Sequence, residues 1–407
     1  MKKVVIIGGG ASGLVTAINA KNKDNEVIIL EKNDICGKKI LATGNGRCNY
    51  YNDNQDINNY YSTNNECLNK IITKDNLVKV NNLFNELGII PKIKNGYYYP
   101  LSNQASSIRN ILVSKVEDLG VKIINNFNVN KVEKQNNKFI IFSADEKIEA
   151  DVVVIATGSY AAVKNIDEVI GYKILEKFNH KIEQVLPSLV QLKGNETYFK
   201  EWNGVRCDVN LKLFEDNMFI KEESGEIQLT DYGISGICTF NISGYVSRGL
   251  FNNKKEVVQI DFLPTIGNSK LDLLNFLEDR NKRLNNINLL EFFEGILNDK
   301  LIKTIFKISN IDGDKKYDEL TKKEKELLLS NIKEFKLKIT GTNDFSKAQT
   351  CTGGLSLDEI NLNTMESKTV NDLYVVGELI DIDGVCGGYN LTFAWLSGIL
   401  AGSDISD

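Results

Sequence analysis

The chain has 407 residues, of which 42% are hydrophobic and 25% are charged, as in an ordinary soluble globular protein of two or three domains. A net charge of −5 excludes a global positive field that would draw the chain to nucleic acid, although it leaves room for a local basic patch. No apolar run reaches the ~18 residues that span a bilayer, and the N-terminus lacks the features of a signal peptide. We therefore expect a cytoplasmic protein without a membrane partner.

The cysteine and histidine content restricts the chemistry further. The seven cysteines are scattered and form no CxxC pair, which argues against both a disulfide framework and a zinc site. The single histidine, His180, excludes most catalytic triads, zinc sites and haem sites, so we expect no bound metal. Its polar neighbours predict a position on the surface.

The first thirty residues predict a strand, a helix and a second strand. Lys3–Ile7 and Glu26–Leu30 are apolar β runs, and Ala11–Asn22 between them has helical spacing. Gly8, Gly10 and Gly13 form the G-x-G-x-x-G pattern at the junction of the first strand and the helix. Such glycines permit a tight turn and a close approach of the backbone to a pyrophosphate, which the helix N-terminus attracts.

Glu31 ends the second strand and can accept hydrogen bonds from the ribose hydroxyls of adenosine. The pattern therefore predicts a dinucleotide cofactor, and by itself it fits both FAD and NAD. The residues expected at the adenosine and pyrophosphate end are Gly8, Gly10, Ala11, Ser12, Gly13, Glu31 and Lys32.

Three further segments favour FAD. Lys39–Asn49 is a glycine-containing loop that lets a planar ring or a phosphate lie against the backbone, and Arg47 adds a fixed positive charge. A second glycine turn, Ala156-Thr157-Gly158, follows the apolar strand Val152–Ile155. Near the C-terminus, Leu373–Val376 ends at Gly377-Glu378, whose carboxylate can bind a ribityl hydroxyl.

A glycine-rich stretch then precedes the closing helix, Leu391–Ala401. It holds Gly384, Gly387 and Gly388 and places a helix N-terminus where the N1–C2=O edge of a reduced flavin would gather negative charge. No second G-x-G-x-x-G follows a strand, so we expect no separate NAD(P) domain. A nicotinamide donor would have to reach the flavin through an open cleft.

The middle of the chain predicts two insertions. Short alternating runs from about residue 187 are typical of a small, mainly β domain, and from Lys270 to about Lys338 the spacing becomes helical. The predicted layout is a cofactor domain of residues 1–186 and 342–407, a β domain of residues 187–266 and a helical domain of residues 267–341.

At this point the chain resembles a known family. The blocks that carry the resemblance are GKKILATGNGRCN, TDYGISG, TMESK and GELIDIDGVCGGYNLTFAWLSGILAG. They are similar to the signature blocks of the HI0933-like or YhiN-like flavoproteins, also labelled aminoacetone oxidase-like and BaiN-like, along essentially the whole chain. The resemblance implies an α/β fold with FAD in a Rossmann-type domain that carries an inserted β domain and an inserted helical domain.

The same resemblance implies the flavin-lining residues. These are Gly44, Gly46, Arg47, Glu378, Asp383, Gly388, Asn390 and Leu391, and Val129 is implied to meet the adenine through its backbone. We add the neighbours Lys39, Cys48, Ala156, Thr157, Gly158 and Gly377. TDYGISG is either a turn that faces the flavin cleft or the helical domain, or a purely structural turn.

Three functions stay open. The first is an FAD-dependent reductase of an activated carbon–carbon double bond, with a slight preference for uridine in 23S ribosomal RNA, which becomes dihydrouridine, over a small molecule such as a steroid acid. The second is an FAD-dependent oxidase of a small amine or carbonyl compound that uses oxygen. The third is a non-catalytic flavin-binding redox sensor. NAD(P)H is one candidate for the transient electron donor of the reductase, and the sequence leaves the physiological donor open.

A reductase needs a proton donor beside the flavin. Cys386, Tyr389, Asp383 and Cys48 lie in the glycine-rich loops, and Arg47 is a charge partner because it does not readily lose its proton. The cysteines and Tyr389 also fit a packing role, and Asp383 also fits a loop-holding role. A phosphate-contacting face for ribosomal RNA would use the cations of the helical insertion, which interleaved acids otherwise make a solvated surface: Lys270, Arg280, Lys282, Arg283, Lys300, Lys303 and Lys307.

Overall fold

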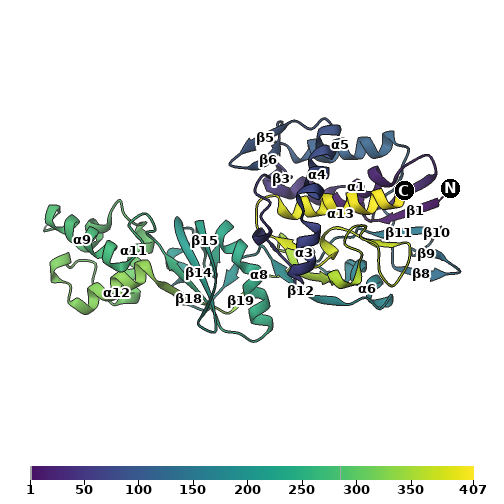
Figure 1. Cartoon of the computed structure of the whole chain (residues 1–407). Coiled ribbons are helices and arrows are strands. Elements are labelled where there is room, and N and C mark those ends of the chain that lie inside the picture. Colours follow the sequence, from purple (N-terminus) through teal and green to yellow (C-terminus); the bar gives the residue numbers. More distant parts are fainter. Residues whose placement is uncertain (1, 285) are drawn as a thin grey trace. The chain divides into compact units, whose positions relative to one another are not determined.

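The computed structural model describes residues 2–284 and 286–407. They form two compact units (Figure 1). Unit 1 consists of Met1–Leu186 and Thr350–Asp407, and unit 2 consists of Pro187–Gln349. The predicted subdivision of the insertion into a β domain and a helical domain stays a prediction.

A five-stranded parallel sheet is the centre of unit 1, in the order β21-β11-β1-β2-β7. The strands are apolar because helices and loops cover both faces, and Val4, Val5 and Ile6 are completely buried. In such sheets ligands bind beyond the carboxyl ends of the strands. The bounds are β1 Lys2–Ile7, β2 Asn25–Leu30, β7 Lys122–Ile124, β11 Val152–Ile155 and β21 Leu373–Val375.

Two helices of unit 1 lie side by side, α1 (Ala11–Ala20), which packs on β1 and β2, and α13 (Tyr389–Ser406), which packs on α1 (Figure 1). Glycines let them approach closely. A Cβ atom at Gly398 would lie 2.6 Å from the Ser12 carbonyl oxygen, and one at Gly402 would lie 2.7 Å from the Thr16 carbonyl oxygen. Because both contacts advance along the two helices in the same direction, α1 and α13 run parallel.

Smaller elements complete unit 1. Its other helices are α2 Lys38–Ala42, α3 Asn65–Ile71, α4 Lys74–Glu86, α5 Ala105–Asp118 and α6 Ile170–Lys177. Its other strands are β3 Tyr51–Asn52, β4 Tyr60–Tyr61, β5 Pro91–Lys94, β6 Tyr97–Pro100, β8 Lys131–Gln135, β9 Lys138–Phe142, β10 Lys147–Ala150, β20 Thr350–Leu355 and β22 Asp383–Gly384, and β12 Ile182–Ser188 pairs with β20. Three strands, in the order β3-β6-β5, form a separate small sheet.

Unit 2 contains a seven-stranded sheet in the order β18-β17-β14-β15-β16-β13-β19. Its strands are β13 Leu192–Lys193, β14 Arg206–Glu215, β15 Met218–Leu229, β16 Gly233–Ser235, β17 Glu256–Asp261, β18 Phe335–Ile339 and β19 Gly341–Thr342. Its helices are α7 Phe199–Trp202, α8 Ile237–Phe251, α9 Lys270–Arg283, α10 Leu289–Phe293, α11 Asp299–Ser309 and α12 Lys322–Lys333.

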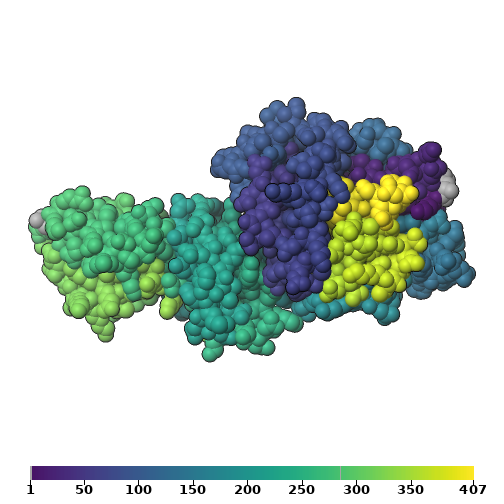
Figure 2. Space-filling model, in the orientation of Figure 1, coloured from purple at the N-terminus to yellow at the C-terminus, as the bar shows by residue number. Residues whose placement is uncertain are grey.

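One hydrophobic core joins the sheet of unit 2 to its helices. It includes Leu211 of β14, Val258 of β17, Phe293 of α10 and Leu301 of α11, all completely buried. The space-filling view accordingly shows no break between the teal strands and the green helices of this unit (Figure 2).

The structure differs from the sequence-based expectations at several elements. Part of the predicted loop Lys39–Asn49 is helical, since it contains α2 and a 3-10 turn at Thr43–Gly46. α8 interrupts the segment predicted as β, because its β-branched residues and two glycines imitate a strand pattern. β15 is missed because most of its residues are at least partly exposed and its charged and polar residues interrupt the apolar alternation.

His180 is buried rather than on the surface, with 5% of its area exposed. Its Nε2 lies 2.7 Å from Ser367 Oγ and its Nδ1 lies 3.2 Å from the Leu175 carbonyl oxygen. The polar neighbours of His180 in the sequence gave no sign of these partners. Among the helices of residues 2–284 and 286–407, none combines the length and the apolar character needed to cross a membrane.

Candidate flavin site

The predicted phosphate-binding turn lies at the carboxyl end of β1. Gly8 has a φ of 109°, and a Cβ atom there would lie 2.4 Å from the Ala156 carbonyl oxygen. A Cβ atom at Gly13 would lie 2.0 Å from the Gly8 carbonyl oxygen, whereas one at Gly10 would meet nothing within 4 Å. Gly8 and Gly13 are therefore required by backbone packing, and Gly10 leaves an open face for a ligand.

The N-terminus of α1 fits an anion. Its N-cap, Gly10, makes no side-chain capping bond, and its first turn has no acidic residue. The first N–H groups of the helix and the positive end of its dipole are thus available to a pyrophosphate. Ala11 and Ser12 lie in this first turn, as predicted from the fingerprint.

The N-terminus of α13 has the same character. Its N-cap, Gly388, has a φ of 94° and makes no side-chain capping bond, and its first turn has no acidic residue. Tyr389 precedes Gly398, the residue beside Ser12, by roughly two and a half helical turns, which is about 13 Å along the axis. The N-termini of α1 and α13 therefore point in the same direction and are offset along the helix axes. This offset is about the length of a ribityl chain plus part of a flavin ring.

This staggered arrangement fits FAD. Its pyrophosphate and the N1–C2=O edge of its ring are the two groups that carry or gather negative charge, and the ribityl chain separates them. Each would lie at one free helix N-terminus. The pair of N-termini, rather than the glycine fingerprint alone, distinguishes FAD as the cofactor that the residues of unit 1 would hold.

Glu31 is fixed beside the glycine turn. It is 6% exposed, its Oε2 accepts a hydrogen bond from the Gly9 N–H at 2.8 Å, and its Oε1 accepts one from the Asn33 N–H at 2.8 Å. Gly9 and Asn33 were not among the predicted site residues. Lys32 reaches toward the Glu168 carbonyl oxygen at 3.5 Å, and Val129 is buried two residues beyond Phe127, whose N–H donates to the Glu31 carbonyl.

Lys39, Glu378 and Ser159 form a polar group at the second glycine turn. Lys39 Nζ lies 3.1 Å from Glu378 Oε2, which also accepts a hydrogen bond from Ser159 Oγ at 3.2 Å. A Cβ atom at Gly158 would lie 3.8 Å from this carboxylate and 3.9 Å from the ammonium group. Ser159 was missed, although its place directly after Ala156-Thr157-Gly158 was a usable signal.

Gly377 gives Glu378 its position. It has a φ of 74°, its N–H donates to Ser397 Oγ at 2.9 Å, and a Cβ atom there would lie 2.5 Å from Ser12 Oγ. The turn at Gly377 is thus packed between α1 and α13. This brings the carboxylate of Glu378 to the same side as the first turn of α1.

The Gly44–Arg47 segment is a left-handed turn with an exposed cation. Gly44, Asn45 and Gly46 have φ values of 55°, 54° and 80°. Arg47 Nε donates to the Gly44 carbonyl at 3.2 Å, and its guanidinium lies 5.3 Å from the centre of the Tyr99 ring. Arg47 is therefore held in place while its charge stays exposed.

Cys48 follows this turn and is completely buried. Burial raises the pKa of its thiol to about 11, so the sulfur is a protonated thiol at neutral pH. This favours the packing role of Cys48 over a redox role.

The glycine-rich loop before α13 is clamped on both sides. Asn390 Oδ1 accepts from the Gly384 N–H at 2.9 Å, and its Nδ2 donates to the Gly384 carbonyl at 2.8 Å. Asn52 Nδ2 donates to the Gly387 carbonyl at 2.9 Å. Tyr389 packs against the loop, and Asn59 Nδ2 donates to its hydroxyl oxygen at 3.1 Å.

The remaining predicted residues lie in or next to this loop. Asp383 is 7% exposed and pairs with Tyr61 in the ladder of β22 and β4. Cys386 is half-buried, and Leu391 is half-buried in the first turn of α13. The predicted residues of unit 1 thus lie in two groups, one near the N-terminus of α1 and one near the N-terminus of α13.

TDYGISG lies in unit 2, where its glycines serve the backbone. Gly233 has a φ of 154° and Gly236 a φ of 108°. Cβ atoms at these positions would lie 2.2 Å from the Leu192 carbonyl oxygen and 2.6 Å from the Glu226 carbonyl oxygen. The spacing of these glycines is explained by strand packing. No group of three or more His, Cys, Asp and Glu residues that could hold a metal ion occurs in residues 2–284 and 286–407.

Comparison with known proteins identifies relatives along the whole chain. The family model described as the HI0933-like protein Rossmann domain matches residues 2–404. A 3-dehydro-bile acid delta(4,6)-reductase of Clostridium scindens is 36% identical over 99% of this chain and 98% of its own length. A ribosomal RNA dihydrouridine synthase of Escherichia coli is 25% identical over 98% of this chain and 97% of its own length.

A solved structure supports the fold. The 3-ketosteroid-delta4-(5alpha)-dehydrogenase of Rhodococcus jostii RHA1 aligns over 100% of this chain and 97% of its own, with a TM-score of 0.51 and 13% identity. At that identity the likeness concerns the fold alone. Together with the family match and the fit of FAD to the two helix N-termini, these findings show that the chain belongs to the HI0933-like family and is an FAD-dependent oxidoreductase with a Rossmann-type cofactor domain.

Proposed function

We propose that the protein reduces a carbon–carbon double bond conjugated to a carbonyl group in a small, ring-shaped substrate. The observation that carries this proposal is the 36% identity, along nearly the whole chain, to a reductase whose name describes such a bond in a 3-dehydro-bile acid. The predicted flavin loops are part of the aligned length. The alternatives are the reduction of uridine in ribosomal RNA, oxidation of a small amine or carbonyl compound, and flavin sensing without catalysis.

The chain supplies the electrostatic part of the reaction. Bound FAD provides a hydride equivalent at N5 for the electron-poor carbon of the conjugated system. The first N–H groups of α13, behind Gly388, would stabilise negative charge at the pyrimidine edge of the ring. Arg47 would add a cation from the Gly44–Arg47 turn, and Lys39 with its ion-pair partner Glu378 would hold the ribityl and phosphate region.

Tyr389 is the proton donor that we propose. Its ring packs against the clamped loop, and Asn59 Nδ2 donates to its hydroxyl oxygen, so the hydroxyl is held at the glycine-rich loop beside the proposed ring. Tyr389 and Asp383 are both buried, and we assign Asp383 to holding the loop because it pairs with Tyr61 in the ladder of β22 and β4. Cys386 is the second candidate for the proton.

The cations of the helical segment favour a small substrate over ribosomal RNA. Lys270 pairs with Glu334 at 2.8 Å, Lys282 with Asp279 at 2.8 Å and Lys307 with Glu201 at 2.5 Å. Arg280 donates to the carbonyl groups of Phe292 and Glu294, and Lys300 donates to that of Asn203. A phosphate backbone would have to compete with these partners, which weakens the case for an RNA-binding face.

The experiment uses the FAD-loaded protein under anaerobic conditions with NAD(P)H as the proposed donor. We expect a 3-oxo-4-ene steroid acid to reoxidise the reduced flavin and to lose its double bond, as measured by absorbance and by mass spectrometry. If the protein does not reduce the steroid but converts uridine to dihydrouridine in an unmodified ribosomal RNA fragment, the result supports the RNA alternative. Rapid peroxide release with an amine in air supports the oxidase.

The role of Tyr389 is tested by Tyr389→Phe. We expect product formation to fall about 10²–10⁴-fold while FAD content is unchanged, since the ring and its packing remain. Cys386→Ala is the matched control, with an expected effect of less than about threefold. Normal turnover in Tyr389→Phe together with a large loss in Cys386→Ala transfers the role to the cysteine.

A further inference from the structure

The small sheet of β3, β6 and β5 has two chemically different faces. Residues alternate between the faces of a strand, so Tyr97 and Tyr99 of β6 share one face and Tyr98 belongs to the other. Tyr98 makes edge contacts with the rings of Tyr50 and Tyr51, and its hydroxyl donates to Asp53 at 2.7 Å. The Tyr98 face is therefore occupied by the protein itself.

The face of Tyr97 and Tyr99 adjoins both predicted flavin loops. A Cβ atom at Gly387 would lie 2.7 Å from the Tyr97 ring, and one at Gly44 would lie 3.8 Å from the Tyr99 ring. Arg47 lies over Tyr99, 5.3 Å from the ring centre. Two half-buried aromatic rings, two residues apart on one strand, thus touch the loops on either side of the proposed isoalloxazine.

The neighbouring strands add polar groups to this face. Asn52 of β3 pairs with Tyr97 in the ladder and donates to the Gly387 carbonyl at 2.9 Å. On the other side, Lys94 pairs with Tyr97 and Lys92 with Tyr99, and side chains paired in this way lie on one face. Both lysines are exposed. The face therefore combines aromatic rings with cations at its outer rim.

We propose that Tyr97 and Tyr99 form the substrate-side wall of the flavin site and select a planar, apolar ring, and that Lys92 and Lys94 favour an anionic group on that ring. A flat ring gains contact area and stacking on two tyrosines that are already held in place. An exposed ammonium pair attracts a carboxylate in a salt-dependent manner. This assignment rests on the proposed function, because it names the substrate class for the same site.

Equilibrium binding tests the wall without turnover. The oxidised, FAD-loaded full chain is titrated with two probes, a 3-oxo-4-ene steroid that carries a carboxylate and the neutral 4-androstene-3,17-dione, and the change in flavin absorbance gives Kd. We expect Tyr97→Ala and Tyr99→Ala each to raise Kd for both probes at least about tenfold, as loss of the apolar contact area of an aromatic ring does. Tyr99→Phe, which keeps the ring, should stay within about threefold.

Two matched controls separate the wall from general stability. Tyr98→Ala removes a ring from the opposite face and should leave both Kd values unchanged, with FAD content as the check of folding. Lys92→Gln combined with Lys94→Gln should weaken the acid about three- to tenfold at low salt and leave the neutral steroid unaffected.

The failures of the two proposals are distinguishable. Wild-type binding in Tyr97→Ala and Tyr99→Ala, or a wild-type protein that binds neither probe, overturns the wall. A wild-type protein that binds the probes through these tyrosines but does not reduce them under NAD(P)H overturns the proposed function and leaves the wall in place.

Discussion

Glu256, the first residue of β17, is a buried carboxyl group that the flavin site does not use. It is 1% exposed, and neither side-chain oxygen has a hydrogen-bond partner among the described residues. It pairs with Glu215 in the ladder of β14 and β17, and a Cβ atom at Gly249 of α8 would lie 1.7 Å from its Oε1. Burial, with a contribution from the carboxylates of Glu215 and Asp216, raises the pKa of Glu256 to about 7.

This raised pKa makes the stability of unit 2 depend on pH. Between the ordinary pKa of 4.5 and about 7, the folded state binds more protons than the unfolded state, so stability falls as pH rises through this window. Glu256→Gln imitates the protonated form. We expect it to flatten the profile and to stabilise the protein by about 1–3 kcal/mol at pH 8. Urea unfolding at pH 5, 6, 7 and 8 measures this, and parallel profiles for the two proteins would falsify the assignment.

At the residue scale, the sequence predicted the groups that belong to a local pattern. Gly8, Gly10 and Gly13 follow a strand at fixed spacing, and Glu31 ends the next strand. The local strand–helix–strand unit therefore brings these residues together, and the sequence pattern is enough to predict it. Ser159 and His180 were not predicted correctly. Their partners, Glu378 and Ser367, lie about two hundred residues away in the sequence, and only the tertiary fold brings them together.

At the element scale, the close packing of α1 and α13 fixes the spacing of the two free helix N-termini. Gly398→Ala adds a methyl group whose carbon would lie only 2.6 Å from the Ser12 carbonyl oxygen. We expect the helices to separate, with a loss of about 1–3 kcal/mol in stability and a weaker hold on FAD. Thermal unfolding and the FAD dissociation constant measure the two effects.

The control for this helix pair is Ala401→Gly, which removes a methyl group from α13 without adding a clash. It should lower stability by about 1–2 kcal/mol, through helix propensity and the loss of a buried methyl group, and leave the FAD affinity unchanged. If Gly398→Ala retains wild-type FAD affinity, the spacing of the N-termini does not control cofactor binding.

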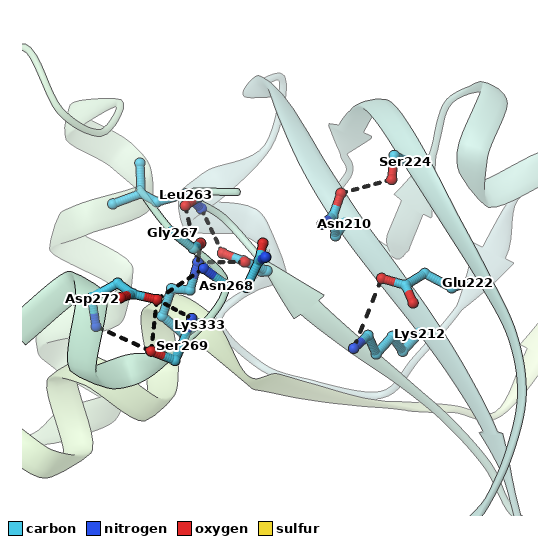
Figure 3. Close-up of polar contacts among 11 residues, drawn as sticks. Asn210, Lys212, Glu222, Ser224, Leu263, Gly267, Asn268, Ser269, Asp272 and Lys333 are labelled. Carbon is cyan, nitrogen blue, oxygen red and sulfur yellow. Dashed lines mark hydrogen bonds and ion pairs between the residues drawn. The ribbon is translucent and has the colours of Figure 1, made fainter. Parts of the chain in front are cut away.

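The connection between β17 and α9 is held by one lysine of α12 (Figure 3). Lys333 is 4% exposed, lies 2.5 Å from Asp261 Oδ2, and donates to the carbonyl groups of Leu263 at 3.0 Å and Gly267 at 2.8 Å. Two residues after Gly267, Ser269 and Asp272 form the capping box that begins α9. Lys333 thus links α12 to the end of β17 and to the connection that leads into α9.

Lys333→Met should therefore be costly. It leaves the Asp261 carboxylate and two carbonyl groups without their shared donor, for which we expect a loss of about 3–5 kcal/mol. Lys270→Met is the matched control, since its pair with Glu334 is exposed and should contribute less than about 1 kcal/mol. Equal losses in urea unfolding would show that the buried ion pair has no special role.

Among the elements, the strands and helices of the cofactor sheet followed the sequence pattern because both faces of the sheet are covered. β15 and α8 did not follow it. β15 is a largely exposed strand whose polar residues are tolerated because its neighbours β14 and β16 supply the hydrogen bonds. α8 is helical because it packs on β15, which overrides the strand preference of its residues.

At the scale of the whole molecule, the sequence pattern predicts separate β and helical insertions, and this subdivision stays a prediction, although one buried cluster of unit 2 contains side chains from both segments. Phe293 and Leu301 of the helices belong to the same buried cluster as Leu211 and Val258 of the strands. The change in periodicity near residue 270 marks a change of secondary structure. It carries no information on which side chains share a core, because packing partners are not encoded in local spacing.

A shared core predicts cooperative unfolding of residues 187–349. Phe293→Ala opens a cavity in α10 and should cost about 3–5 kcal/mol. Because the cavity lies in the common cluster, we expect the amides of β14 and β17 to lose protection from hydrogen exchange together with those of α11, as measured by mass spectrometry. Leu271→Ala, at a side chain that is 62% exposed, is the control and should change none of these rates. If the helices lose protection in Phe293→Ala while β14 keeps its full protection, the insertion consists of two independently folding domains with a boundary near residue 267, because a single cooperative core cannot open at one end only.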